Sequence, residues 1–228
     1  LALAAALLAV QIVLGGLTVL HLLEQWTVIA HLVTGNLFCL VLLLIARALL
    51  GFAAPPRPAP PRVRKLVLIA VHLLFLQVIL GGLVSSNYAG LACPDWPACD
   101  GGRWFPALGG LVGIHIAHRL GAYATVVVFL GLAWAAHREA VIGNLARAAL
   151  SLALFQMLAG VMNVLMRLPV EVTALHSAIA TLLVLVTTLL ARASLKNGKN
   201  RGQTAIKIPG SDPLKLLGSD PGILVPEL

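Results

Sequence analysis

Charged residues are scarce in this chain: they make up 11% of its 228 residues. Soluble domains carry about 25% charged residues, so the composition excludes an ordinary soluble globular domain. Hydrophobic residues reach 60% and the mean hydropathy is +0.98, which indicates an integral membrane protein. Three cysteines are too few for a disulfide scaffold.

The start of the chain also lacks the marks of a complete N-terminus. The chain begins at Leu1 within an apolar stretch, and its first methionine is Met157. A signal peptide with a basic n-region is not visible. We therefore expect either a processed N-terminus or a fragment.

Six apolar stretches are long enough to cross a bilayer, which takes roughly 20 residues. They cover residues 1–22, 28–50, 65–87, 111–136, 144–166 and 171–194. The sequence thus predicts an all-α integral membrane protein with six transmembrane helices.

The basic residues are distributed unevenly among the connections. They gather in a Pro-rich linker at 51–65, around the turn near Arg138, and after residue 191. The positive-inside rule then places both ends of the chain in the cytoplasm and the 88–110 loop outside. The net charge of +8 is on this view a topology signal directed at membrane lipid, and we expect no nucleic-acid partner. The polar tail, 195–228, repeats Gly-Ser-Asp-Pro and is expected to be disordered and cytoplasmic.

Three histidines, His31, His118 and His176, lie near the outer starts of three predicted helices. At 1.5 Å per residue they would lie roughly 5–10 Å below the outer boundary. An ionisable side chain at that depth is a functional-site candidate by default. Histidines from separate helices can hold a haem iron between them. The alternative is that each one hydrogen-bonds a neighbouring helix; for three at one depth we favour ligation.

An internal repeat relates two of these histidines. A shift of 145 residues superposes 11–48 on 156–193 and aligns His31 with His176. A glutamine followed four residues later by glycine occurs at Gln11, Gln77 and Gln156. Helix packing and haem contact explain this pattern equally well, so it counts as evidence of repetition.

The remaining polar candidates are weaker. Arg119 is a candidate partner for haem propionates, with snorkelling toward the interface as the alternative. His115, one turn above His118, is a weaker candidate ligand, and His21, His72 and His137 are not expected to bind one.

The outer loop carries Cys93 and Cys99 in a Cys-Pro-Asp-Trp-Pro-Ala-Cys run. On the oxidising side of a membrane we expect a disulfide between them. Zinc binding is the weaker alternative, because further ligands are not apparent in the loop. Cys39 is interpreted as a small apolar core residue.

The run from Gly81 to Gly101, followed by His115-Ile-Ala-His-Arg119, resembles the heme A synthase family in its proteobacterial form. Gly15-Gly-Leu-Thr-Val19 and Ala30-His31-Leu32 are similar to the family's third and fourth helices. The resemblance covers about residues 1–194 and implies two related four-helix halves. It also implies an oxidoreductase that converts the methyl group of heme O to the formyl group of heme A for cytochrome c oxidase assembly.

The resemblance further implies a b-type haem (heme b, with its iron) between His118 and His176, and a substrate heme O on His31. The partner of His31 and a catalytic glutamate belong to the family's first two helices. The repeat offset places those helices in roughly 80 residues before Leu1. The chain as written is therefore expected to lack the glutamate-bearing helix, and its catalytic residues are unknown.

These expectations divide the chain into four parts. Residues 1–50 form two helices of an incomplete half-bundle, and 51–65 form the cytoplasmic linker. Residues 66–194 form an antiparallel four-helix haem-binding bundle, and 195–228 form the tail. The protein is expected in the bacterial inner membrane, with the Cys93–Cys99 loop in the periplasm.

The resemblance implies two partners beyond lipid: heme O and the farnesyltransferase enzyme that supplies it. The electron acceptor is unknown, and a homo-oligomer is left open. The first alternative function is a b-type cytochrome membrane subunit that only transfers electrons. The second is a transporter or membrane scaffold without haem.

Overall fold

The computed structural model describes residues 1–51, 59–104 and 106–195. Over these residues the chain is helical, with six helices long and apolar enough to cross a membrane. In chain order these are α1 (Ala2–Leu20), α2 (Gln25–Leu49), α3 (Pro61–Ser86), α4 (Gly110–Ala135), α5 (Ala140–Leu165) and α6 (Val170–Leu195). A short 3-10 helix, η1 (Ala89–Leu91), follows α3. The predicted fold class of an all-α, six-span membrane protein is confirmed.

Helices α2, α3 and α5 begin three or four residues earlier than their apolar stretches predict. α3 begins at Pro61 instead of residue 65, and α5 begins at Ala140 instead of 144. In α3 the reason is a polar first turn with Arg62 and Arg64, which hydropathy does not detect although its backbone is helical. Proline is well accommodated at the first helical position because its missing N–H has no partner there anyway. The predicted linker at 51–65 is thus partly helical, since its residues 61–65 belong to α3. Residues 52–58 of the linker and residues 196–228 of the predicted tail lie outside the described residues.

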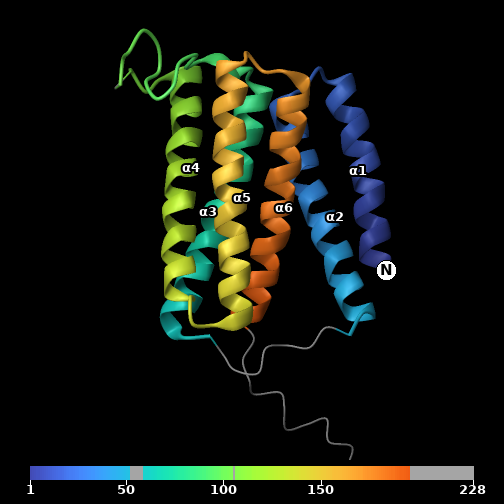
Figure 1. The fold of residues 1–228 in the computed structure, drawn as a ribbon. Helices are drawn as coiled ribbons and strands as arrows, with labels where there is room; N and C mark the ends of the chain where they lie inside the picture. Colours follow the sequence, from blue (N-terminus) through green and yellow to red (C-terminus); the bar gives the residue numbers. More distant parts are fainter. Residues whose placement is uncertain (52–58, 105, 196–228) are drawn as a thin grey trace, which may run out of the picture. The chain divides into compact units, whose positions relative to one another are not determined.

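Helices α3 to α6 form a closed ring of neighbours (Figure 1): α3 packs on α4, α4 on α5, α5 on α6, and α6 on α3. The core lies toward the end of the ring where α3 begins. Its fully buried members include Val67, Phe129, Leu132, Leu183 and Leu190. Small residues of α5, Ala146 and Ala149, let the neighbouring backbones approach closely.

The α1–α2 pair lies beside this ring. α2 contacts both α3 and α6, whereas α1 contacts α2 alone among the described helices. A small separate core of Ala4, Leu7 and Val41 joins the two. The rest of α1 presents apolar side chains outward, including Ile12 and Val13.

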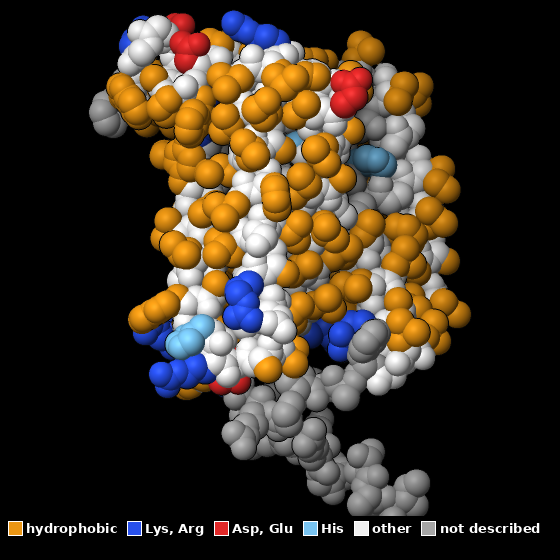
Figure 2. All heavy atoms as spheres, in the orientation of Figure 1, with side chains coloured by type: hydrophobic (Ala, Val, Ile, Leu, Met, Phe, Trp, Pro, Cys, Tyr) orange, Lys and Arg blue, Asp and Glu red, His pale blue; other side chains and the backbone are white. Residues whose placement is uncertain are grey.

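The surface matches a bilayer environment. Apolar side chains cover most of the visible face (Figure 2), as expected where the surroundings are lipid. The turns at 21–24 and 166–169 lie at the same end as the 87–109 loop, which we call the loop end. The opposite, basic end carries Arg47, Arg62, Arg64, Lys65, Arg138, Arg147 and Arg192. This is an integral multi-pass membrane protein.

Candidate functional site

The three predicted histidines lie at matched depths below the loop end. His31 is in the second turn of α2, His118 is in the third turn of α4, and His176 is in the second turn of α6. Their distances from the helix starts are roughly 9–12 Å along the axes. The similar depth follows from chain direction, because α2, α4 and α6 all begin at the loop end.

Each of these imidazoles lies against a glycine of the preceding helix. A Cβ atom added at Gly15 would lie 3.2 Å from Cε1 of His31, and one at Gly81 would lie 3.4 Å from Cε1 of His118. At Gly160 the corresponding distance to Cε1 of His176 is 3.3 Å. The same ring-on-backbone contact thus occurs in α1–α2, α3–α4 and α5–α6.

The glutamines one turn before Gly15 and Gly81 also take part, and the sequence interpretation missed this. Gln77 donates from Nε2 to the backbone carbonyl of His118 at 3.0 Å. Gln11 does the same for the carbonyl of His31 at 2.9 Å. Gln156 differs, since its amide makes no hydrogen bond to the carbonyl of His176 among the described residues; its Oε1, like that of Gln77, is buried without a partner. The Gln-x-x-x-Gly spacing was the available signal, because residues four apart share a helix face.

The two nitrogens of each ring have different surroundings. The Nδ1 atoms of His31, His118 and His176 are buried without a hydrogen-bond partner. Their Nε2 atoms are not among the buried, unpartnered atoms of the described chain. His118 and His176 lie on α4 and α6, which face each other across the ring: α4 packs on α3 and α5, and so does α6. A pair of imidazoles from α4 and α6 with free nitrogens is a donor set that suits a metal needing two opposed ligands, as haem iron does.

Arg119 is engaged with the outer loop. Its Nη2 donates to the carbonyls of Cys93 at 2.6 Å and Asp95 at 2.9 Å, and its Nη1 donates to Ala98 at 3.2 Å. Its Nε donates to Nε2 of His115 at 2.9 Å. Most of the guanidinium's N–H groups are therefore in use, since arginine has about five. The propionate contact stays a prediction.

His115 is a structural residue of the same cluster. It is 4% exposed, and its Nδ1 lies 2.8 Å from the carbonyl oxygen of Ala89. A carbonyl can only accept, so Nδ1 carries the proton and Nε2 accepts from Arg119. Both ring nitrogens are occupied, which leaves none for a metal.

The outer loop is closed by a disulfide between Cys93 and Cys99. Both cysteines are buried, at 0% and 3% exposure, beneath the backbone that Arg119 holds. Cys39, the one free cysteine of the described chain, is partly buried in α2.

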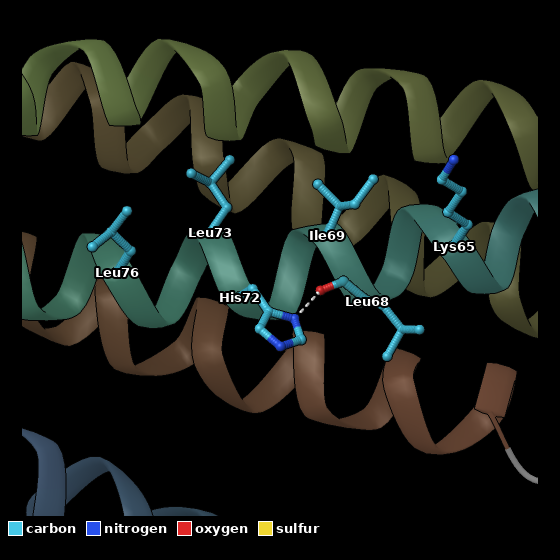
Figure 3. A pocket seen from close by; sticks show the side chains of 6 residues that line it. All are labelled: Lys65, Leu68, Ile69, His72, Leu73 and Leu76. Carbon is cyan, nitrogen blue, oxygen red and sulfur yellow. Dashed lines mark hydrogen bonds between the residues drawn. The ribbon is translucent and has the colours of Figure 1, made fainter.

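The other three histidines each contact a residue three or four positions away in the sequence. His72 bonds through Nδ1 to the carbonyl of Leu68 in its own helix, within a shallow surface pocket that only α3 residues line (Figure 3). His137 bonds the carbonyl of Trp134, and His21 lies 3.4 Å from the carboxylate of Glu24. None of the three joins His31, His118 or His176.

Comparison with known proteins identifies related chains. A family model described as cytochrome oxidase assembly protein matches residues 1–188. The chain is 31% identical over 203 residues to the heme A synthase of Shewanella oneidensis, covering 78% of this chain and 61% of that protein. It is 30% identical over 183 residues to the heme A synthase of Rhizorhabdus wittichii, covering 75% and 52%. The chain therefore spans about half to three fifths of the length of these relatives.

Proposed function

The chain belongs to the cytochrome oxidase assembly protein family, and we propose that it supplies the haem-binding part of a heme A synthase. The proposed reaction oxidises the methyl group of heme O to the formyl group of heme A for cytochrome c oxidase biogenesis. The observation that carries the proposal is the pair His118 and His176, which lie at matched depths on α4 and α6, two opposite members of the closed ring.

The residues present fit a b-type haem at this pair. The buried Nδ1 of each ring leaves Nε2 as the nitrogen available to iron. Glycines 81 and 160 keep side-chain atoms away from the rings, so neither imidazole is displaced by a neighbouring Cβ.

The part played by the protein is binding and orientation. His118 and His176 would hold the iron from two helices, α4 and α6. When bound, haem supplies reversible one-electron chemistry, with a potential set by its axial ligands and burial. Arg119 would hold the outer loop over this end of the ring through the carbonyls of Cys93, Asp95 and Ala98.

His31 is the proposed ligand for the substrate, heme O. Its support is the equivalence of its surroundings to those of His118: a glycine under the ring and a glutamine on its carbonyl. His31 lies on α2, outside the ring of α3 to α6, and we assign it to a haem of its own.

We propose an orientation and a location from the charge distribution. Seven basic residues lie at the basic end, and the positive-inside rule would put that end in the cytoplasm of a bacterial inner membrane. The Cys93–Cys99 loop would then face the periplasm, where disulfides persist. The proposed partners are heme O, the farnesyltransferase enzyme that makes it, an electron acceptor, and membrane lipid; a homo-oligomer is compatible with the exposed face of α1.

The test is spectroscopic. We expect the purified chain to show a reduced-minus-oxidised difference spectrum of a low-spin b-type haem. His118→Ala and His176→Ala should each abolish that spectrum at equal protein yield, because either leaves the iron with one protein ligand. The matched control is His72→Ala, which removes a spanning histidine that bonds only its own helix.

Absence of haem from the folded wild-type chain would overturn the proposal in favour of a scaffold or transporter. A haem signal without conversion of added heme O by a form carrying the family's full set of helices would favour an electron-transferring b-type cytochrome. Conversion that is lost in His31→Ala, with the b-type spectrum kept, would support the assignment of both haem sites.

A further inference from the structure

Helices α3 and α4 are joined by a reciprocal contact at the level of His118. The imidazole of His118 lies on Gly81 of α3, and the side chain of Gln77 lies on Gly121 of α4. A Cβ at Gly121 would be 2.1 Å from Oε1 of Gln77, so glycine is needed there for the glutamine to lie across α4.

The α1–α2 pair repeats this arrangement. His31 lies on Gly15, and Gln11 lies on Gly35, where an added Cβ would be 3.4 Å from its Nε2. In both pairs the glutamine amide donates to the backbone carbonyl of the histidine. Two helix pairs distant in sequence therefore share one arrangement of four residues.

We propose that Gln77 and Gly81 are positioning residues for His118 as a haem ligand, and that Gln11 and Gly15 position His31 in the same way. This inference rests on the proposed function. The glutamines and glycines touch no iron; they act through the histidine.

The physical basis combines two contacts. We call the hydrogen bond from Gln77 to the carbonyl of His118 the clamp, and the close approach of the His118 ring to Gly81 the seat. In the membrane interior no water competes for the amide of Gln77, so its bond to the carbonyl of His118 holds α4 at a fixed height against α3. The seat at Gly81 then lets Cε1 of the ring approach the α3 backbone. With Cε1 at 3.4 Å and Nε2 at 4.0 Å from the Cβ position of Gly81, and Nδ1 buried, rotation of the ring is restricted; Nε2 is the ring nitrogen that is not buried without a partner.

The α5–α6 pair provides an internal comparison. Gly160 lies under His176, but no hydrogen bond from the Gln156 amide to the carbonyl of His176 occurs within the described residues; the Oε1 of Gln156, like that of Gln77, has no partner. His176 therefore has the glycine contact without the hydrogen bond from the glutamine. Replacement of Gln156 by an apolar residue should leave its ligand undisturbed, since no hydrogen bond of that side chain is lost.

The experiment compares Gln77→Leu and Gly81→Ala with wild type in the purified, haem-loaded chain. We measure haem content, the low-spin ferric electron paramagnetic resonance signal, and the midpoint potential. Gln77→Leu should retain haem but broaden and shift the low-spin signal, because the ring plane is no longer held. Gly81→Ala should shift the signal and the potential, because a methyl group 3.4 Å from Cε1 forces the ring to move by a few tenths of an ångström.

The matched controls are Gln156→Leu, which removes an unclamped glutamine, and Gly131→Ala, whose Cβ meets nothing within 4 Å. Both should keep the wild-type signal and potential. If Gln77→Leu fails to fold, Gly121→Ala serves instead, since one methyl group displaces the Gln77 amide without removing it.

The outcomes separate the two proposals. A wild-type chain without haem would overturn the proposed function, and this inference with it. A wild-type chain with bound haem whose signal and potential are unchanged in Gln77→Leu, or in Gly121→Ala where that replaces it, would overturn only the positioning role. An equal disturbance from Gln156→Leu would also overturn it, because the effect would not depend on the clamp.

Discussion

The guanidinium of Arg119 on α4 donates a hydrogen bond of 2.6 Å to the backbone carbonyl oxygen of Cys93. This bond reaches from the residue after His118 to the first cysteine of the disulfide loop. The carbonyls of Asp95 and Ala98 accept from the same group. The loop is thus tied to α4 directly beside the proposed haem ligand.

Replacement of Arg119 by lysine should loosen that loop. A lysine ammonium is a point charge and cannot reproduce the planar fork that reaches three carbonyls and His115 at once. Loss of one such bond should lower the free energy of loop opening by about 1.5–3 kcal/mol, so the loop amides should exchange about tenfold faster or more. Hydrogen-exchange mass spectrometry over residues 89–104 measures this.

The control for that experiment is Arg103→Lys. Arg103 pairs with Asp100 at the surface, where both side chains are more than half exposed, and such a pair contributes about 0–1 kcal/mol. Its exchange rates should stay near those of wild type. Equal protection in Arg119→Lys and wild type would contradict the anchoring role.

His115→Ala should destabilise the fold while leaving haem bound. The substitution leaves the carbonyl of Ala89 and the Nε–H of Arg119 without a partner, at about 1–3 kcal/mol for each buried group. Thermal unfolding in detergent measures the loss, and the haem spectrum measures ligation. A folded His115→Ala protein with the low haem content of His118→Ala would show that His115 is a ligand.

The disulfide should be detectable by counting thiols. Of the three cysteines only Cys39 is free, so maleimide should label the unfolded, unreduced protein once and the unfolded, reduced protein three times. Replacing Cys93 and Cys99 by serine should lower stability by about 2 kcal/mol, the chain-entropy value for so short a loop. Three labels before reduction would contradict the bond.

Gly143→Ala should lower the free energy of unfolding by about 1–3 kcal/mol through overpacking. A Cβ at Gly143 would lie 2.5 Å from the backbone oxygen of Ala136, and a backbone atom in the tight α4–α5 turn cannot step aside as a side chain can. The control is Gly131→Ala, which meets nothing within 4 Å and should be neutral or stabilise the helix by up to about 1 kcal/mol. Thermal denaturation followed by circular dichroism compares the two.

Much of the fold was predictable because each spanning helix is identified by the composition of its own stretch of sequence. The apolar stretch at 111–136 predicted α4 to within one residue of Gly110–Ala135. The beginning of α3 at Pro61 was not predictable from hydropathy, because Arg62 and Arg64 lie in its first turn and Lys65 follows directly. Helical backbone there is decided by dihedral preference and the positions of neighbouring helices.

The candidate site was also predictable only in part. The depth of His31, His118 and His176 was readable from their distance to the helix starts, and the repeat showed that two of them are equivalent. The engagement of Arg119 with loop carbonyls was not readable, because a sequence does not record where a loop backbone returns to a helix.

By itself, the sequence determined that this is a membrane protein with six spans and three histidines at one depth. Those properties depend on the composition of single segments and on a fixed rise per residue. Only the tertiary structure decided that Gln77 reaches the carbonyl of His118, and that glycine lies beneath each imidazole. Such contacts depend on the rotation and separation of two helices, and those are set by packing along their whole length.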